Sequence, residues 1–584
     1  MVTSSSKNFI FHLIRCAALP VVCFSVSPAS AQSLVTNGTF EEAIDPWWGY
    51  TAEEFIQTVD VLEGRMCSTI EVGGENYWDV IIGLSDLALV AGQNYRISFS
   101  ASSDVDRSIR FKTGLGDAPY TDYFLRTIKL TATPQTFEST YLNLREDAVA
   151  QFQFHIGGTP GVVCFDDIII EPVAAPIVPP YTTPSLTGHA LKDYKAIIKM
   201  GTAVDTPTFL SQPAHNAILT GEFSMFTPAN SMKMNIIQGT QGVFDWVETD
   251  ALLAFAEANA MEFHGHPLVW HTQAPAWLED GEFDRDAMIA VMYAHIDALV
   301  GRYVGRIPYW DVVNEAIDKV GEVYDFRSTI WHDRIGPDFI DLAFQRARLV
   351  DPNALLLYND YNIEVMGNAK ADRVFELVKD MKTRGIPIDQ VGFQGHWYIT
   401  EDGGSSGLPD AAAVRANMAR YEEIGVGVQI TEFDVRIGLP ITPEKQQTQA
   451  RVYQEILQAC IDAPNCSHFT VWGISDIDSW VPSTFENFDS AHLFDASFVA
   501  KPAYHAFTNA LALLPADGTV GAGTGGAGSG TGGAGPVVTT PTTKSGCSYE
   551  PRPISAASGW RLVFASLLGL ALLFRRGLSA RARG

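Results

Sequence analysis

An alternation of strand-like runs and amphipathic helices through residues 188–512 constrains the fold most strongly. Helices are predicted at residues 246–260, 286–303, 337–350, 370–384 and 443–460; Thr442 precedes the last as a candidate N-cap, with Pro443 at its first position. Eight strand-like runs lie near Lys199, Phe223, Glu262, Pro308, Leu355, Val391, Val426 and His468. Eight such units in roughly 325 residues predict a (β/α)₈ TIM barrel.

The chain of 584 residues is longer than one domain. Residues 1–31 resemble a signal peptide, with Lys7 and Arg15 near a short apolar stretch and small residues before Gln32. Residues 33–173 contain short β-rich runs and predict an all-β jelly-roll sandwich, followed by a linker at 174–187. The protein is therefore expected to be secreted, multidomain and monomeric.

After the barrel, residues 513–545 form a Gly- and Thr-rich linker, and residues 546–584 form a C-terminal tail. The tail has Cys547, an apolar run at 562–574 and an Arg cluster. It resembles a myxobacterial-type sorting signal that is cut after export, and the alternative is a weak membrane anchor at the cell surface. Only this tail is expected to contact a membrane.

The net charge of −27, with no basic patch before the C-terminus, argues against nucleic acid as a partner. An acidic chain with 12 Trp and 19 Tyr fits a neutral polymer such as polysaccharide. In an oxidising compartment, Cys460–Cys466 and Cys67–Cys164 are predicted disulfides. Cys460 and Cys466 are close in the sequence, whereas Cys67 and Cys164 lie far apart in another segment. No Cys and His spacing predicts zinc, and no cofactor is expected for catalysis.

Polar and aromatic residues follow six of the predicted barrel strands, and the C-terminal ends of such strands carry active sites. Glu315 ends the fourth run and Glu432 the seventh. Retaining glycosidases use two such carboxyl groups, one as acid and one as nucleophile. His396 and Asp434 are expected to hold the nucleophile, and Asn314 to bind the sugar 2-hydroxyl. A buried ion pair at the barrel rim is the alternative for either glutamate alone.

Residues 188–512 resemble glycoside hydrolase family 10 endo-β-1,4-xylanases. The resemblance rests on Gly265-His-Pro-Leu-Val-Trp-His-Thr-Gln273, Trp310-Asp-Val-Val-Asn-Glu315, Leu357-Tyr-Asn-Asp-Tyr361, Gln394-Gly-His396, Ile430-Thr-Glu-Phe-Asp434 and Val471-Trp-Gly473. It implies Glu315 as acid/base, Glu432 as nucleophile, and a disulfide at Cys460–Cys466. It also implies that the sugar is bound by Asn230, Lys233, His266, Trp270, Gln273, Asn314, Gln394, His396, Trp472 and Trp480, with xylan and related plant cell-wall polysaccharide as substrate.

One departure from the family concerns Ala229, which stands where the family usually has a glutamate that binds sugar on the non-reducing side. Losing that contact should weaken the subsite by about 1–3 kcal/mol. Pro267, in place of the usual threonine, is a lesser departure. Two alternatives therefore stay open: an enzyme acting on mixed or cello-type β-glucan, and a glycan-binding protein built on a barrel that has lost catalysis.

The N-terminal domain resembles family 4/9-type carbohydrate-binding modules, through Leu34-Val-Thr-Asn-Gly-Thr-Phe-Glu41 and Val163-Cys-Phe-Asp-Asp-Ile-Ile169. Glu41 and Asp167 either contribute to a structural calcium site, which favours hard carboxylate oxygens, or are simply solvated charges. The candidates for sugar stacking, about half of which are expected to be core residues instead, are Trp47, Trp48, Trp78, Tyr120 and Tyr123.

Overall fold

The computed structural model describes residues 32–517, apart from positions 42, 53, 118–119, 179, 206–209, 211, 405–406 and 513 and the side chain of residue 478. The predicted signal peptide at 1–31 and the tail at 546–584 lie outside the described residues, as does the Gly- and Thr-rich segment from 518 onward.

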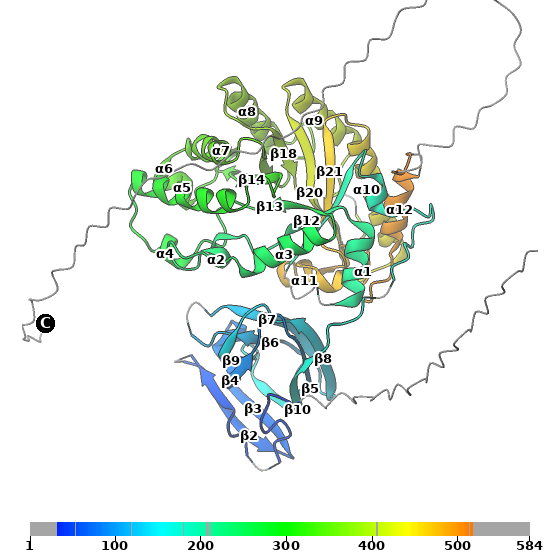
Figure 1. The fold of residues 1–584 in the computed structure, drawn as a ribbon. Helices are drawn as coiled ribbons and strands as arrows, with labels where there is room; N and C mark the ends of the chain where they lie inside the picture. The colour runs from blue at the N-terminus through cyan, green and yellow to red at the C-terminus, as the bar shows by residue number, and fades with distance from the viewer. Residues whose placement is uncertain are drawn as a thin grey trace, which may run out of the picture. The chain divides into compact units, whose positions relative to one another are not determined.

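The N-terminal domain consists of two five-stranded sheets, which confirms the predicted all-β domain (Figure 1). All pairings within both sheets are antiparallel. One sheet has the order β1 (Trp48–Thr51), β4 (Val80–Leu89), β9 (Asp147–His155), β6 (Arg107–Gly114) and β7 (Asp122–Leu130). The other has the order β2 (Ile56–Leu62), β3 (Arg65–Val72), β10 (Gly161–Val173), β5 (Asn94–Ser103) and β8 (Gln135–Leu142).

Both sheets contribute to one hydrophobic core, in which aromatic side chains pack edge to face. Phe99 of β5 lies 5.0 Å, between ring centroids, from both Phe111 of β6 and Phe154 of β9. Cys67 of β3 and Cys164 of β10 are register partners and form a disulfide, as predicted. The bond closes a long loop, because the two cysteines are 97 residues apart.

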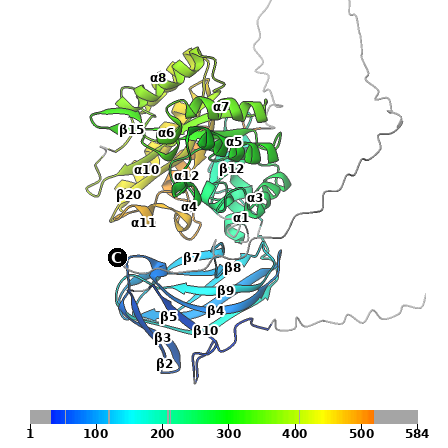
Figure 2. The ribbon, with the colours of Figure 1, turned by 90° about the vertical axis from the view of Figure 1, so that its left-hand side faces the viewer.

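Eight parallel strands form the barrel, and pairing of β18 with β20 closes it (Figures 1 and 2). Each of the eight predicted strand-like runs is confirmed. In barrel order, the strands are β11 (Lys199–Val204), β12 (Met225–Pro228), β13 (Glu262–Gly265), β14 (Tyr309–Asn314), β17 (Leu355–Asp360), β18 (Gln390–Phe393), β20 (Gly427–Gly438) and β21 (Cys466–Val471).

Helices surround these strands, and all five predicted ones are present within two residues of their expected ends. They are α3 (Val247–Ala258), α5 (Arg285–Arg302), α7 (Phe339–Val350), α8 (Ala369–Thr383) and α10 (Pro443–Ile461). Thr442 caps α10 as predicted, because its side chain accepts a hydrogen bond from the backbone N–H of Lys445. Further helices are α1 (Pro213–Glu222), α2 (Met234–Ile237), α4 (Ala276–Glu279), α6 (Ile330–Ile335), α9 (Ala411–Glu423), α11 (Val481–Thr484) and α12 (Pro502–Leu511).

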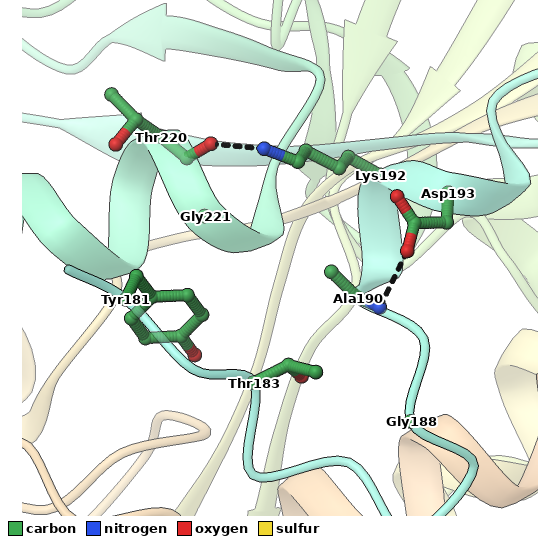
Figure 3. Close-up of a pocket in the computed structure, with 8 residues that line it drawn as sticks. All are labelled: Tyr181, Thr183, Gly188, Ala190, Lys192, Asp193, Thr220 and Gly221. Atoms are coloured by element: carbon green, nitrogen blue, oxygen red, sulfur yellow. Dashed lines mark hydrogen bonds between the residues drawn. The ribbon is translucent and has the colours of Figure 1, made fainter.

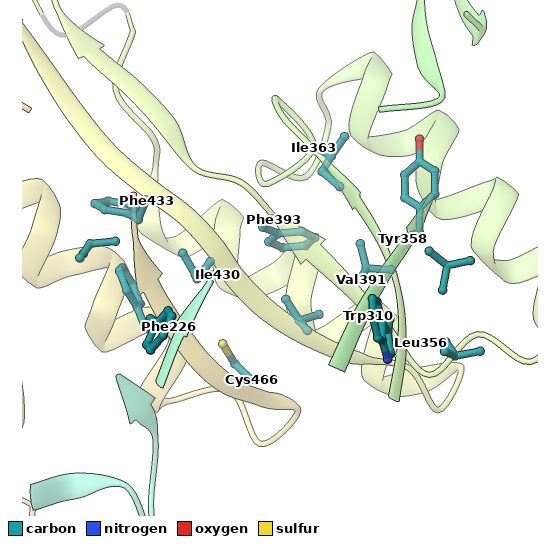
Figure 4. Packing of buried hydrophobic residues seen from close by; sticks show 14 of the residues in the cluster. Phe226, Trp310, Leu356, Tyr358, Ile363, Val391, Phe393, Ile430, Phe433 and Cys466 are labelled. Carbon is teal, nitrogen blue, oxygen red and sulfur yellow. The ribbon is translucent and has the colours of Figure 1, made fainter. Parts of the chain in front are cut away.

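The barrel core is packed with large side chains from the strands (Figure 4). Phe226 of β12, Trp310 of β14 and Phe433 of β20 are all almost fully buried. Gly265 is required at the end of β13, because a Cβ there would lie 2.3 Å from the Trp310 ring. The core thus leaves no room for substrate inside the barrel and confines chemistry to its ends.

Additional elements extend the barrel beyond the C-terminal ends of its strands. A hairpin of β15 (Ile317–Val320) and β16 (Val323–Phe326) follows β14. The long strand β20 continues past the barrel and pairs with β19 (His396–Ile399) and β22 (Phe488–Asp489). Through this extension, β20 carries polar side chains beyond Glu432.

The predicted disulfide Cys460–Cys466 is present and ties the end of α10 to the start of β21. The last part of the predicted linker contacts the barrel, where Thr183 and Tyr504 of α12 share a 2.9 Å hydrogen bond. Among the described residues, no helix has the length and apolar character needed to cross a bilayer.

Candidate active site

A pocket of about 490 Å³ opens at the C-terminal ends of the barrel strands. Ten of the predicted site residues line it: Lys233, His266, Trp270, Asn314, Glu315, Gln394, His396, Glu432, Trp472 and Trp480. They come from the ends of β12, β13, β14, β18, β20 and β21 or the loops that follow these strands. The structure therefore brings the two glutamates and their expected neighbours into one cavity.

Glu315 directly follows β14 and has a left-handed backbone with φ of 57°. This conformation is uncommon for a residue with a side chain, and such strain concentrates at functional sites. The turn is held by a hydrogen bond from the Glu315 N–H to the Asn359 carbonyl and by Arg327, whose Nε donates to the Glu315 carbonyl. Its side chain is 13% exposed. The backbone thus fixes one carboxylate at the pocket wall.

Side-chain amides connect the two glutamates across the barrel mouth. Asn359, at the end of β17, donates to Oε1 of Glu432 at 2.7 Å and to Oδ1 of Asn314 at 2.9 Å. Asn314 in turn donates to Oε1 of Glu315 at 3.2 Å. Gln394 donates to the same Oε1 at 3.1 Å. Thr431 orients Asn359 by donating to its amide oxygen at 2.7 Å.

A histidine and a buried aspartate support Glu432 from the other side. Nε2 of His396 lies 3.3 Å from Oε2 of Glu432, and its Nδ1 lies 3.0 Å from Oδ2 of Asp434. Burial opposes the charged form of His396, but Asp434 and Glu432 together raise its pKa to about 10. Asp434 does not line the pocket; it accepts from Trp480 Nε1 at 2.8 Å. This arrangement agrees with its expected supporting position.

The β12 side of the pocket contains Lys233, whose Nζ donates to Oδ1 of Asn230 at 2.9 Å and lies 4.8 Å from the Trp270 ring centroid. Burial lowers the pKa of Lys233, and the charges of Glu432, Asp205 and Glu315 oppose that change. Asn230 itself is absent from the pocket lining and is hydrogen-bonded to Asp205. It holds Lys233 rather than facing the cavity.

Gln273 also does not line the pocket. Its carbonyl accepts a hydrogen bond from the Asn235 N–H at 3.0 Å, and its φ is 54°. The residue therefore shapes the loop that follows β13. His266 does line the pocket. The buried Asp311 orients its ring, because Nδ1 of His266 lies 2.8 Å from Oδ2 of Asp311.

Aromatic rings form much of the pocket wall, as expected for a site that binds flat sugar faces. Trp270, Trp472 and Trp480 are all partly exposed there. Trp480 packs edge to face against His396, with ring centroids 5.1 Å apart. His396 therefore contacts both the Trp480 ring of the pocket wall and the candidate nucleophile Glu432.

Sequence reasoning missed several residues of the site, one beneath the pocket and five in its lining. Asn359, which contacts Glu432, appeared only as part of a strand-end motif. Arg436 was missed although it lies two and four residues after Asp434 and Glu432 on one strand, a spacing that places side chains on the same face. The other pocket residues missed are Tyr361, Asn362, Tyr398 and Phe485.

In the N-terminal domain, Trp47 is wrong as a sugar-stacking candidate. Its side chain is only 4% exposed, and it packs against Phe40, Phe152 and Phe154. Its Nε1 donates to the Asn37 carbonyl, so even its polar edge is used internally. Burial of a strand-edge Trp depends on sheet pairing, which the sequence alone does not specify.

The other four aromatic candidates of this domain are accessible to different extents. Trp78 and Tyr120 are 52% and 63% exposed. Trp48 and Tyr123 are partly buried: Trp48 donates to Ser85 at 2.9 Å and Tyr123 to Asp147 at 2.8 Å. Trp78 and Tyr120 thus present the most free ring surface.

Glu41 and Asp167, the calcium candidates, are both exposed. Burial raises the pKa of the neighbouring Asp166, and the charges of Asp167 and Glu41 raise it further. These three carboxylates therefore lie within electrostatic range of one another. Within the described part of the chain, however, no group of three or more His, Cys, Asp or Glu side chains is arranged to hold a metal.

A second cavity, of about 370 Å³, lies near the N-terminal ends of β11 and β12 (Figure 3). Its polar groups contact one another: Lys192 donates to the Thr220 carbonyl at 2.6 Å, and the Ala190 N–H donates to Asp193 at 2.9 Å. Tyr181 donates to the buried Glu222 at 2.7 Å. These contacts attach the preceding segment to the barrel, and this end of such barrels serves stability.

Comparison with known proteins agrees with this geometry. The carbohydrate binding domain profile matches residues 32–161. Endo-1,4-beta-xylanase 5 of Pyricularia oryzae is 37% identical over 318 residues, covering 54% of this chain and 76% of that protein. Endo-1,4-beta-xylanase A of Fusarium oxysporum is 38% identical over 293 residues, covering 50% of this chain and 88% of that protein.

Among solved structures, native xylanase 10B from Thermotoga maritima superposes with a TM-score of 0.52 at 35% identity. The superposition covers 55% of this chain and 98% of that one. The profile described as Glycosyl hydrolase family 10 matches residues 189–510, which include all eight barrel strands and every residue that lines the pocket at their C-terminal ends. The chain therefore belongs to glycosyl hydrolase family 10.

Proposed function

We propose that this glycoside hydrolase is an endo-1,4-β-xylanase that cleaves internal linkages of xylan. The observation that carries the proposal is the pair Glu315 and Glu432, joined through Asn314 and Asn359 in one aromatic-walled pocket. The similarity to proteins described as endo-1,4-beta-xylanases supports the choice of substrate.

The proposed reaction is a double displacement that retains anomeric configuration. Glu432 attacks the anomeric carbon, the glycosidic C–O bond breaks, and Glu315 gives its proton to the leaving oxygen. Water then attacks the glycosyl-enzyme ester, its proton passes to Glu315, and the Glu432 carboxylate leaves. Both glutamates end in their starting states, so no cofactor is required.

The hydrogen bonds around the two carboxyl groups support these separate roles. Oε1 of Glu315 accepts from both Asn314 and Gln394, which leaves Oε2 to carry the transferable proton. Glu432 accepts from Asn359 and faces His396, whose pKa is raised to about 10, so that a cation lies beside the proposed nucleophile. Asn314 lies between the two and is proposed to bind the sugar 2-hydroxyl.

Other residues are proposed to position the polymer. Trp270, Trp472 and Trp480 provide ring faces for stacking, while Lys233, His266 and Gln394 provide donors for sugar hydroxyls. Asn230 and Gln273 are proposed to act through the loops and side chains that they hold, since neither lines the cavity.

The test is release of reducing ends from linear neutral xylan by the purified protein, compared with soluble cellulose derivatives and mixed-linkage β-glucan. An early fall in viscosity identifies internal cleavage. Release only from the glucans would reassign the substrate. No release from any β-1,4-glycan by folded protein would instead indicate a glycan-binding protein without catalysis.

We propose that residues 33–173 form a jelly-roll carbohydrate-binding module that holds the enzyme on plant polysaccharide. Trp78 and Tyr120 are its proposed stacking residues, because their rings are more than half exposed. We further propose that Glu41 and Asp167 provide two carboxylate ligands to a structural calcium ion. A rise in the melting temperature with calcium, absent in Asp167→Asn, tests this site independently of activity.

We propose that the protein is secreted as a monomer after removal of residues 1–31, and that the tail at 546–584 is a sorting signal cut after export. The alternative is that the tail stays intact and anchors the protein at the cell surface. The two disulfides support an oxidising compartment. Mass spectrometry of both termini of the exported protein tests processing: an intact C-terminus that includes Arg583 would rule out cleavage of the tail, and retention of residues 1–31 would rule out the leader.

A further inference from the structure

Arg436 is a cation of the pocket lining with no polar partner among the described residues. Arg436 lies on β20 four residues after Glu432 and lines the cavity. In the part of the chain that the structure describes, none of its nitrogens has an ion pair or a hydrogen bond, and its Nε is fully buried. Two cations outside the lining are paired: Arg327 with Asp318 at 2.8 Å, and Lys370 with Asp360 at 2.6 Å. Lys233, which also lines the pocket, differs from Arg436 because its Nζ donates to Oδ1 of Asn230 at 2.9 Å.

Aromatic rings hold the Arg436 guanidinium in place without neutralising it. Its central carbon lies 3.8 Å from the Phe485 ring centroid, 5.2 Å from that of Tyr398 and 5.5 Å from that of Phe488. Such stacking fixes the plane of the group and leaves its edge donors free. A fixed guanidinium edge matches the two oxygens of a carboxylate.

Among the residues that the structure describes, no carboxylate pairs with this charge. Asp434 is the nearest acidic influence, but its carboxylate is already used by His396 and by Trp480. The buried Nε is removed from water, and this burial lowers the pKa of Arg436. Keeping an unpaired, half-buried cation is costly unless a ligand pairs with it.

Neutral sugar hydroxyls do not require a full positive charge, whereas an acidic sugar does. We propose that Arg436 binds the carboxylate of a uronic acid branch on the polysaccharide, and this inference rests on the proposed function of the pocket. Arg436 extends from the β18–β20 side of the barrel, opposite Lys233 and Trp270, which follow β12 and β13. Arg436 therefore binds a branch on sugars that lie on the β20 side of the pocket, and not on the sugars that contact Lys233 and Trp270.

The test uses one acidic substrate and its neutral twin: a glucuronic acid-branched xylan and the same polymer with each carboxylate reduced to an alcohol. For the unaltered enzyme, kcat/KM is expected to be about tenfold higher on the acidic polymer, as a charge-assisted pair predicts. This preference should shrink as salt is raised. In Arg436→Met the ratio should fall to about one, while Arg436→Lys should keep part of it.

The control is Arg346→Met, which removes another arginine stacked on an aromatic ring, Tyr293, outside the pocket. It should leave the ratio unchanged. Equal kcat/KM on the two polymers by the unaltered enzyme, or a ratio unmoved in Arg436→Met, would overturn the proposal and indicate a packing role only. The comparison of the two polymers by the unaltered enzyme needs no variant, so its result does not depend on whether a variant folds. Failure to cleave either polymer would count against the proposed function itself.

Discussion

The side-chain amide of Asn359 lies 2.7 Å from Oε1 of Glu432, and the same nitrogen lies 2.9 Å from Oδ1 of Asn314. One buried residue of β17 therefore aligns the proposed nucleophile with the amide that contacts Glu315. These hydrogen bonds join residues on β14, β17 and β20, so they form only once these strands are paired in the barrel.

Removing this amide should slow catalysis. In Asn359→Ala, we expect kcat to fall by about 10- to 100-fold, the worth of a hydrogen bond to a charged group. Asn359→Asp should be worse, because a second carboxylate would face Glu432. Thr431→Val, which frees only the amide oxygen of Asn359, should cost less. Steady-state rates on neutral xylan measure all three, and equal activity of the Asn359 variants and the parent would contradict this positioning role.

The pair of His396 and Asp434 should make stability fall at alkaline pH. The pKa of folded His396, about 10, lies above its ordinary value near 6.5, so its stabilising contribution is complete below pH 6.5. Between these values only the folded protein keeps the proton, and stability declines as pH rises toward 10. Denaturant titration of the parent and His396→Gln should show their difference in unfolding free energy shrinking from pH 6 to pH 10. A constant difference would show that the histidine is not charged at neutral pH.

Restoring a carboxylate at position 229 should strengthen binding of short substrates. Ala229 directly precedes Asn230, whose side chain accepts a hydrogen bond from the pocket residue Lys233. In Ala229→Glu, the KM for short xylo-oligosaccharides should fall about tenfold, because the added group can pair with a sugar hydroxyl. Ala229→Gln is the uncharged control of equal length. An unchanged KM in the glutamate variant would mean that the loop no longer presents position 229 to the sugar.

Substituting two tryptophans of the N-terminal module should affect two different properties, polysaccharide binding in one case and stability in the other. Trp78→Ala should weaken retention on insoluble polysaccharide by about fivefold or more, with an unchanged melting temperature, since the ring is exposed. Trp47→Ala should lower the unfolding free energy of the module by about 3–5 kcal/mol, since it empties a core position. Affinity depletion assays and calorimetry distinguish the two effects, and the opposite pattern would exchange the roles of the two residues.

The barrel was predictable because its signals are local and repeated. Eight apolar runs separated by helical periodicity predict the strands one by one, and Thr442 with Pro443 marks the start of α10. The paired glutamates were also predictable, because a charged residue at the end of a buried strand points to the rim. Cys460–Cys466 was predictable from its short spacing, and Cys67–Cys164 because these two cysteines share the other domain of a chain expected to enter an oxidising compartment.

The remaining site details depend on contacts between distant segments. Asn230 and Gln273 belong to motifs that reach the pocket, yet their own side chains and backbone hold neighbouring residues. Phe485, which stacks on Arg436, is brought there by a loop that follows β21. Trp47 was misassigned because it directly precedes β1 and packs into the core, whereas the adjacent Trp48 is only partly buried, and the sequence does not say which of the two rings is buried.

Trapping the covalent glycosyl-enzyme shows whether Glu432 is the nucleophile. A 2-deoxy-2-fluoro-xylobioside with a good leaving group slows the second step, and peptide mass spectrometry then locates the added sugar. We expect a single adduct on Glu432, absent in Glu432→Gln. Hydrolysis of the reagent without any adduct, or an adduct on another residue, would contradict it.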